Sequence, residues 1–449
     1  MKKWRCRICG YIHRGENPPE LCPVCGAAAE DFKPLEDLFI HKDYSSIKRI
    51  IIVGNGAAGI EAARTIRENN AEVEILVLSD ESYPFYSRMH LSTFIGEDSP
   101  IEHITIHPPN WYKELKITTI LDTAIKIVDP KKQKVTDQQG NSYSYDKLIL
   151  ATGAAPAIPP LAGSDKKGVF VLRNLAQALQ IREQRTEYTE VVIIGGGILG
   201  IEAAASLRKT GKKATIIEIS DRLMPQQLDK DGASVLTHLL EVRGITVKTS
   251  MKIAEVSGAS QVQGVRLVSG EELPAQMVIF AAGITPNNVL AVQAGIKVSR
   301  GIVINQKMET NQPNIFAAGD AAEFQQTIYG IWPAAVEQGM AAGANAIGIP
   351  ILYRGTTPLH ILKVAGIEMT AIGKKYPDQP GEEQIIFRKP QAGEYVKLVH
   401  NREFLLGALV LGIAGVGFRL EKLIKKNISI RNILGELAAG NWEVLRKKQ

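Results

Sequence analysis

The sequence contains little cysteine, and all of it lies at one end. The four cysteines of the 449 residues fall within the first 25 positions. No disulfide can therefore form in the rest of the chain, and no thiol beyond Cys25 is available there for redox chemistry. The opening Met1-Lys2-Lys3-Trp4 also lacks the apolar core of a signal peptide. Both features favour a reducing, cytoplasmic compartment.

Long apolar runs and strong net charge are also lacking. The longest uncharged apolar run, from Phe404 to Phe418, is shorter than a bilayer requires and is interrupted by glycines. We therefore expect a buried strand and a turn there, and no membrane span. The formal net charge is only +6, and no stretch interleaves basic with aromatic residues. This pattern argues against a nucleic-acid partner.

Two Cys-x-x-Cys-Gly motifs lie close to the N-terminus. In such a motif two thiolates grip one metal ion, and the glycine permits the tight turn that follows. Four thiolates at this spacing predict a closed tetrahedral site. The ligands would be Cys6, Cys9, Cys22 and Cys25. Because tetrahedral sulfur coordination suits both iron and zinc, the motifs alone leave the metal open.

A strand that runs into a glycine-rich turn is the feature around which the rest of the chain is organised. The apolar residues 50–53 precede Gly54, Gly56 and Gly59, and an alanine-rich helical stretch follows. Glycines let the backbone approach a pyrophosphate, and the free amides of the first helical turn point at it. A second strand, residues 73–78, leads to Asp80 and Glu81, which could bind a ribose hydroxyl. The pattern predicts a dinucleotide site.

The same pattern of strand, glycine-rich turn and helix recurs later in the chain. Residues 191–194 precede Gly195, Gly197 and Gly200, and the segment 201–204 repeats the Ile-Glu-Ala-Ala of residues 60–63. Two such units imply two bound nucleotides. Glu218 lies in the next strand, where an acid would bind the ribose 2′-hydroxyl and repel a 2′-phosphate. The second site is therefore predicted to prefer NADH over NADPH.

The N-terminal motifs resemble a known family. Tyr11 after the first motif, Pro23 inside the second and the Asp31-Phe32 pair make residues 4–34 similar to a rubredoxin, of the short-spaced type found at the end of rubrerythrins. This resemblance implies a single iron that carries one electron, and it favours iron over zinc.

Residues 48 to about 410 resemble the two-nucleotide flavoprotein disulfide-reductase superfamily. The resemblance rests on the paired glycine motifs, Ala151-Thr152-Gly153, Ala281-Ala282-Gly283 and Gly319-Asp320. It implies that FAD contacts Gly54, Gly56, Gly59, Glu81, Arg88, Ala124, Gly153, Gly319 and Asp320. It implies that NADH contacts Gly195, Gly197, Gly200 and Glu218.

The resulting fold class is α/β, with two Rossmann-like nucleotide-binding domains, an α+β C-terminal domain and a small rubredoxin-like domain with four cysteines at the N-terminus. Residues 1–38 would form the metal domain and 39–47 a linker. Residues 48–162 and 284–348 would form the FAD-binding domain, 163–283 the NAD-binding domain and 349–449 the C-terminal domain.

Residues 86–92 are similar to the rubredoxin reductases and to the flavin region of the large nitrite reductase subunit. Some of these relatives place a lysine after the Leu-Ser pair, where it pairs with the glutamate of the second motif near the flavin N5. This chain has Thr93 at that position. We therefore take Glu202 and Arg88 as the catalytic pair, with Arg88 as the partner of Glu202.

Together these resemblances imply an FAD-dependent NADH:rubredoxin-type oxidoreductase whose iron acceptor is fused to it. Onward acceptors would be proteins such as rubrerythrin, a flavodiiron protein or free rubredoxin. One alternative is a reductase that serves a separate rubredoxin or a nitrite-reducing partner, with the N-terminal domain only as a docking element. A different class is a zinc-ribbon interaction protein whose flavin senses NADH.

Overall fold

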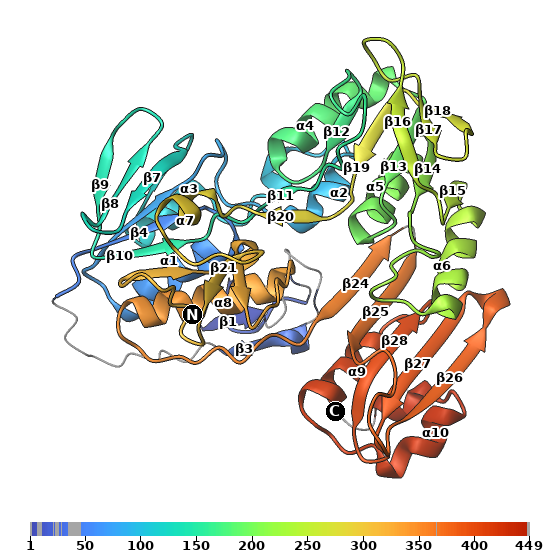
Figure 1. Cartoon of the computed structure of the whole chain (residues 1–449). Helices are drawn as coiled ribbons and strands as arrows, with labels where there is room; N and C mark the ends of the chain where they lie inside the picture. Colours follow the sequence, from blue (N-terminus) through green and yellow to red (C-terminus); the bar gives the residue numbers. More distant parts are fainter. Residues whose placement is uncertain are drawn as a thin grey trace. The chain divides into compact units, whose positions relative to one another are not determined.

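The structure is a computed structural model that describes residues 2–6, 11–20, 22, 27, 29–34, 46–364 and 366–446. The chain forms two compact units, and Figure 1 labels their helices and strands where there is room. The first comprises Met1–His90, Ser99–Ala155 and Ile284–Thr356, and the second Leu91–Asp98, Pro156–Gly283 and Thr357–Gln449. Most of the predicted linker, like Cys9 and Cys25, lies outside the described residues.

A parallel five-stranded sheet forms the centre of the first unit. Its order is β22 (Ile315–Ala317), β10 (Lys147–Leu150), β4 (Arg49–Val53), β5 (Glu74–Leu78) and β6 (Ile117–Ile120). Ile50, Ile51 and Ile52 of β4 are fully buried, as expected for a parallel strand that is covered on both faces. The order reverses between β10 and β4, which is where doubly wound sheets bind nucleotides.

Helices α1 (Ala57–Asn69) and α8 (Trp332–Ala346) pack closely against each other in this unit. A Cβ atom at Gly339 would lie 2.3 Å from the Ala58 carbonyl oxygen, and one at Gly343 would lie 2.6 Å from that of Ala62. The small residues of both helices therefore permit a backbone approach that larger side chains would block.

Shorter elements complete the first unit. The N-terminal sheet has the order β2 (Ile12–Arg14), β1 (Lys3–Cys6), β3 (Phe32–Pro34). An antiparallel meander consists of β7 (Ile125–Asp129), β8 (Lys134–Asp137) and β9 (Ser142–Ser144). Strand β21 (Ile302–Ile304) pairs with β23 (Ala322–Phe324), and α3 (Pro109–Glu114) and α7 (Val289–Gln293) are short helices. Strand β11 (Ala154–Pro156) pairs with β20 (Ile284–Pro286).

The second unit contains another parallel five-stranded sheet. Its order is β12 (Val169–Val171), β19 (Met277–Phe280), β13 (Glu190–Ile194), β14 (Lys213–Ile217) and β15 (Ile245–Lys248). Its helices are α2 (Leu91–Phe94), α4 (Leu175–Gln184), α5 (Ile198–Lys209) and α6 (Lys230–Val242). A small sheet consists of β16 (Ile253–Ser257), β17 (Gly264–Leu267) and β18 (Glu272–Pro274).

An antiparallel sheet and two short helices form the C-terminal part of this unit. The sheet order is β24 (Leu359–Val364), β25 (Ile367–Gly373), β28 (Leu405–Leu411), β27 (Glu394–His400) and β26 (Glu383–Lys389). The helices are α9 (Val416–Lys425) and α10 (Leu434–Ala438). The apolar run from Phe404 thus supplies strand β28, and no described helix is long and apolar enough to span a bilayer.

Candidate nucleotide sites and metal centre

The first glycine loop joins β4 to α1, and its three glycines have different surroundings. A Cβ atom at Gly54 would lie 2.1 Å from the Ala151 carbonyl oxygen, and one at Gly59 would lie 2.0 Å from that of Gly54. Gly54 also has a φ of +118°, which favours glycine. By contrast, a Cβ atom at Gly56, the N-cap of α1, would have no neighbour within 4 Å. The loop is therefore tightly packed on the protein side and open beside the helix N-terminus, as a pyrophosphate requires.

The other residues predicted to contact FAD follow the carboxyl ends of strands in the same sheet. Glu81 follows β5, Ala124 follows β6, Gly153 follows β10, and Gly319 with Asp320 follows β22. Because these strands are parallel, their carboxyl ends meet at one edge of the sheet. The structure thus gathers the predicted set at the edge where a doubly wound sheet binds its ligand.

A cavity adjoins the first glycine loop. It is lined by Asn55, Gly56, Ser79, Glu81, Tyr83, Phe85, Tyr86 and Arg88. The Tyr86 hydroxyl donates a hydrogen bond of 2.5 Å to Glu81, and the Arg88 guanidinium forms an ion pair with the same carboxylate. Acidic, aromatic and cationic groups are therefore fixed around one open space. This donor and acceptor set fits the ribose and pyrophosphate of FAD.

The second glycine loop, between β13 and α5, repeats the geometry of the first. Cβ atoms at Gly195 and Gly200 would lie 2.4 Å and 2.0 Å from carbonyl oxygens, while one at Gly197 would have no neighbour within 4 Å. Buried Glu218 accepts hydrogen bonds from the backbone amides of Gly196 (2.7 Å) and Ser220 (2.8 Å). The carboxylate is therefore held against the loop, as expected for the acid that selects the ribose.

Replacement of Glu218 with alanine should narrow the preference for NADH over NADPH by about tenfold, because a fixed carboxylate repels a 2′-phosphate. The ratio of kcat/KM values for the two nucleotides measures this effect. Glu241→Ala is the matched control, since Glu241 is an exposed acid on α6 of the same unit. Equal ratios in the two variants would remove Glu218 from this role.

Glu202, which lies on α5, is half-buried and contacts Ser92 of α2. The Ser92 hydroxyl donates a hydrogen bond of 2.7 Å to Glu202 Oε2, and Ser92 itself is buried. Burial raises the pKa of Glu202 to about 7, and the hydrogen bond from Ser92 lowers it in part. Each member of the expected pair also has a partner within its own unit. Glu202 has Ser92 as its hydrogen-bond partner, whereas Arg88 forms its ion pair with Glu81.

The segment Leu91–Asp98 is fixed to the second unit by further contacts. The Arg185 guanidinium donates a hydrogen bond of 2.7 Å to the carbonyl oxygen of Ile95 and forms an ion pair with Asp98. A Cβ atom at Gly96 would lie 2.6 Å from the Ser206 carbonyl oxygen of α5. These contacts explain why this segment groups with residues 156–283 in the second unit.

The raised pKa of Glu202 predicts that the stability of the folded protein falls as the pH rises towards 7. Between the ordinary glutamate pKa and about 7, the folded protein keeps a proton that the unfolded chain has released. The contribution of this group to stability is therefore fully present below the ordinary value and is lost as the pH rises to about 7. Glu202→Gln, which stays neutral, should show a smaller fall in melting temperature from pH 5 to pH 8 than the unmodified protein. Identical falls would contradict a raised pKa of Glu202 in the folded protein.

The described part of the N-terminal motifs shows two equivalent backbone hydrogen bonds. The Cys6 amide donates to the Tyr11 carbonyl oxygen and the Cys22 amide donates to that of Ala27, both at 2.7 Å. Cys6 and Cys22 are buried and cluster with Ala27 and Phe32. One described cysteine of each motif thus lies in the same buried cluster, and this arrangement fits a single tetrahedral metal site.

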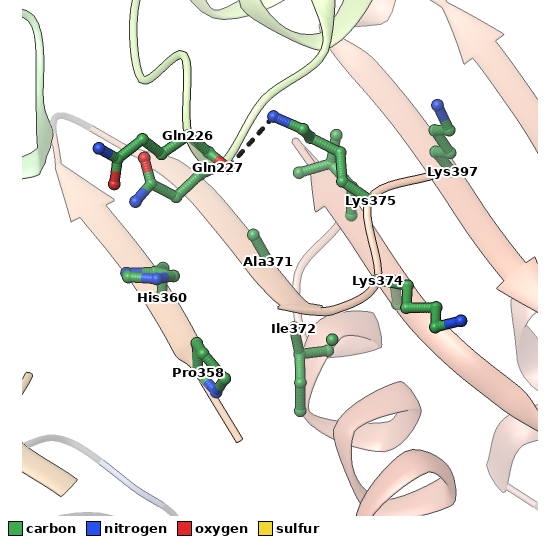
Figure 2. A pocket seen from close by; sticks show the side chains of 12 residues that line it. Gln226, Gln227, Pro358, His360, Ala371, Ile372, Lys374, Lys375 and Lys397 are labelled. Atoms are coloured by element: carbon green, nitrogen blue, oxygen red, sulfur yellow. Dashed lines mark hydrogen bonds between the residues drawn. The ribbon is translucent and has the colours of Figure 1, made fainter. Parts of the chain in front are cut away.

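A further cavity lies in the second unit between the segment 226–227 and the C-terminal sheet, and Figure 2 shows its lining. The Lys375 ammonium donates to the carbonyl oxygens of Pro225 (2.9 Å) and Gln226 (3.2 Å). Buried Lys397 pairs with Asp229 at 3.1 Å. The third lysine of the lining, Lys374, pairs with Asp378 and Glu382. Since these ammonium groups are bound to protein oxygens, we interpret the cavity as a structural junction.

Comparison with protein families identifies the main body of the chain. Residues 48–339 match the family described as "Pyridine nucleotide-disulphide oxidoreductase". The chain belongs to this family. Residues 4–33 match "Rubrerythrin, rubredoxin-like domain", and residues 358–428 match "Rubredoxin NAD+ reductase C-terminal domain". These matches confirm the predicted fold class and the predicted cofactors FAD and NADH, and the rubredoxin-like domain implies iron.

Similar proteins support the same assignment. The chain is 35% identical to the "Assimilatory nitrate reductase electron transfer subunit" of Bacillus subtilis over 81% of its length and 48% of that protein. It is 31% identical to the "NADH-rubredoxin oxidoreductase" of Clostridium acetobutylicum over 86% of its length and 96% of that protein. The crystal structure of NADH:rubredoxin oxidoreductase from Clostridium acetobutylicum superposes with a TM-score of 0.71 at 31% identity, covering 86% of this chain and 97% of that one. The chain spans about half the length of several other curated relatives that it matches.

Proposed function

We propose that this protein oxidises NADH and passes the electrons through FAD to an iron centre in its own N-terminal domain, and from there to a separate acceptor. The observation that carries the proposal is the packing within the first unit. Ile106 and Trp332 contact both the core of the FAD-binding part and the cluster around Cys6 and Cys22. This packing supports electron transfer from the flavin-binding part to the metal site of the same chain.

Each cofactor has a set of residues that would hold it. The first glycine loop, with Glu81 and Arg88, would bind FAD, and the second loop, with Glu218, would bind NADH. Cys6, Cys9, Cys22 and Cys25 would bind the iron. When bound, FAD converts the two-electron hydride of NADH into the single electrons that a rubredoxin-type iron accepts.

The chain's own side chains would position the nucleotides and control one proton. Glu202 is the proposed catalytic residue, since its pKa of about 7 lets it hold or release a proton near neutral pH. The hydrogen bond from Ser92 fixes the orientation of this carboxyl group. Arg88, whose ion pair with Glu81 holds it at the FAD cavity, would offer positive charge to the pyrophosphate.

The external acceptor is proposed to be a protein of the cytoplasm that takes single electrons, such as rubrerythrin, a flavodiiron protein or free rubredoxin. A second candidate is a nitrate- or nitrite-reducing partner, which the name of the Bacillus subtilis relative favours. Pairing each purified acceptor with the fully loaded protein and following NADH oxidation would separate these candidates.

An anaerobic titration with NADH tests the proposal by counting electrons. If both centres accept electrons, full reduction consumes about 1.5 NADH per chain, because the flavin takes two electrons and the iron takes one. An end point of about 1.0 NADH per chain would mean that only the flavin is reduced. Metal analysis of the same sample should find iron, and finding zinc alone would favour the interaction-protein alternative.

A further inference from the structure

The cysteine module, by which we mean the described residues from 2 to 34, makes a charged contact with helix α1. Arg5, on strand β1, reaches Glu61 with an Nη2 to Oε1 distance of 2.6 Å. The other terminal nitrogen of Arg5 lies 3.4 Å from the sulfur of Met340 on α8. The side chain of Arg5 therefore bridges the module and the two helices that pack beside the first glycine loop.

Glu61 is part of a buried ionic cluster on α1. Arg64 binds Glu61 through its Nε at 3.0 Å and binds Glu68 through its Nη1 at 2.7 Å. The side chains of Glu61 and Arg64 are only 7% and 5% exposed, so water compensates little of their charge. Within α1 this cluster has two acids and one base, and Arg5 supplies the second positive charge. Without Arg5 the cluster would keep two acids against one base, and this incompletely compensated charge would carry an energetic cost.

Glu61 occupies the same position in the first repeat that Glu202 occupies in the second. Glu202 accepts a hydrogen bond from Ser92 of its own unit. Glu61 instead forms an ion pair with Arg5 of the cysteine module. The apolar side of the contact is made by Ile106 and Trp332, which pack on the cluster of Cys6, Cys22 and Phe32. A charged contact and an apolar contact thus hold the module at one place.

We propose that the Arg5 to Glu61 ion pair is a docking clamp that holds the cysteine module on α1 and the start of α8. This inference rests on the proposed function for its purpose, since the clamp would keep the iron close to the flavin-binding part between turnovers. Arg5 is a positioning residue, because it acts through Glu61 and does not touch a reacting atom.

Charge reversal in the full chain loaded with FAD and iron tests the clamp. Arg5→Glu places a negative charge against Glu61 and should slow the reduction of iron by NADH at least about tenfold. Flavin reduction should stay unchanged. The conservative variant Arg5→Lys keeps the positive charge beside Glu61 and should retain most of the rate. Lys2→Glu is the matched control, since it makes the same charge change at an exposed residue of the same module.

Hydrogen–deuterium exchange gives a readout that needs no electron transfer. Arg5→Glu should speed exchange in the segments 101–107 and 329–340, which contain Ile106 and Trp332, while Lys2→Glu should not. Equal exchange and equal rates in the two variants would overturn the clamp and leave the proposed function standing. If iron is not reduced even in the unmodified protein, the proposed function fails, and the exchange result alone then decides whether the module docks through Arg5.

Discussion

Replacement of Cys22 with alanine is expected to abolish reduction of the iron centre and of the external acceptor while NADH still reduces the flavin at its normal rate. Cys22 is only 3% exposed and lies in the cluster that contains Cys6. Removing one of the four thiolates from a tetrahedral site leaves an incomplete ligand set in a small domain that depends on its metal. We expect the acceptor-coupled rate to fall at least about a hundredfold.

The control is Lys33→Gln, an exposed residue on strand β3 of the same module. It should retain the visible absorbance of ferric thiolate and the full acceptor-coupled rate. If Cys22→Ala reduced the external acceptor as fast as this control, the electrons would leave the flavin directly. The cysteine module would then be a docking element only.

Alanine at the third glycine of each loop should show which loop binds FAD and which binds NADH. A Cβ atom at Gly59 or at Gly200 would lie 2.0 Å from a backbone carbonyl oxygen of its own loop, so either substitution forces the loop apart. Gly59→Ala is expected to lose most of its FAD. Gly200→Ala should keep its FAD but raise the KM for NADH by at least about tenfold.

Gly435→Ala serves as the control for both substitutions. A Cβ atom at Gly435 on α10 would have no neighbour within 4 Å, so this variant should keep normal FAD content and KM. FAD content is read from absorbance after gel filtration, and KM from steady-state NADH oxidation. Loss of FAD from Gly200→Ala together with its retention in Gly59→Ala would reverse the assignment of the two loops.

The strand before each glycine loop and the helix after it could be predicted, because the residues that specify them are close together in the sequence. A run of β-branched residues, three glycines at fixed spacing and a helix of small residues specify the turn by themselves, and the structure forms it as β4 to α1 and as β13 to α5. The equivalence of the two copies was also visible in the repeated Ile-Glu-Ala-Ala segment.

The partners of the repeated glutamates could not be predicted, because they depend on which distant segments fold against each helix. Ser92 lies 110 positions before Glu202, and Arg5 lies 56 positions before Glu61. Charge alone suggested Arg88 as the partner of Glu202, and the ion pair of Arg88 with Glu81 within the first unit could not be predicted in the same way. One feature of the sequence could have predicted Ser92 as a partner of Glu202. Some relatives have a charged residue at the position of Thr93, and its absence here leaves the preceding serine to bind Glu202.

Rapid mixing of the fully loaded protein with NADH under anaerobic conditions tests the central claim most directly. We predict that the flavin absorbance bleaches first and that the ferric-thiolate absorbance bleaches afterwards, at a rate independent of protein concentration because the transfer occurs within one chain. A ferric-thiolate band that persists after the flavin is fully reduced would contradict this account.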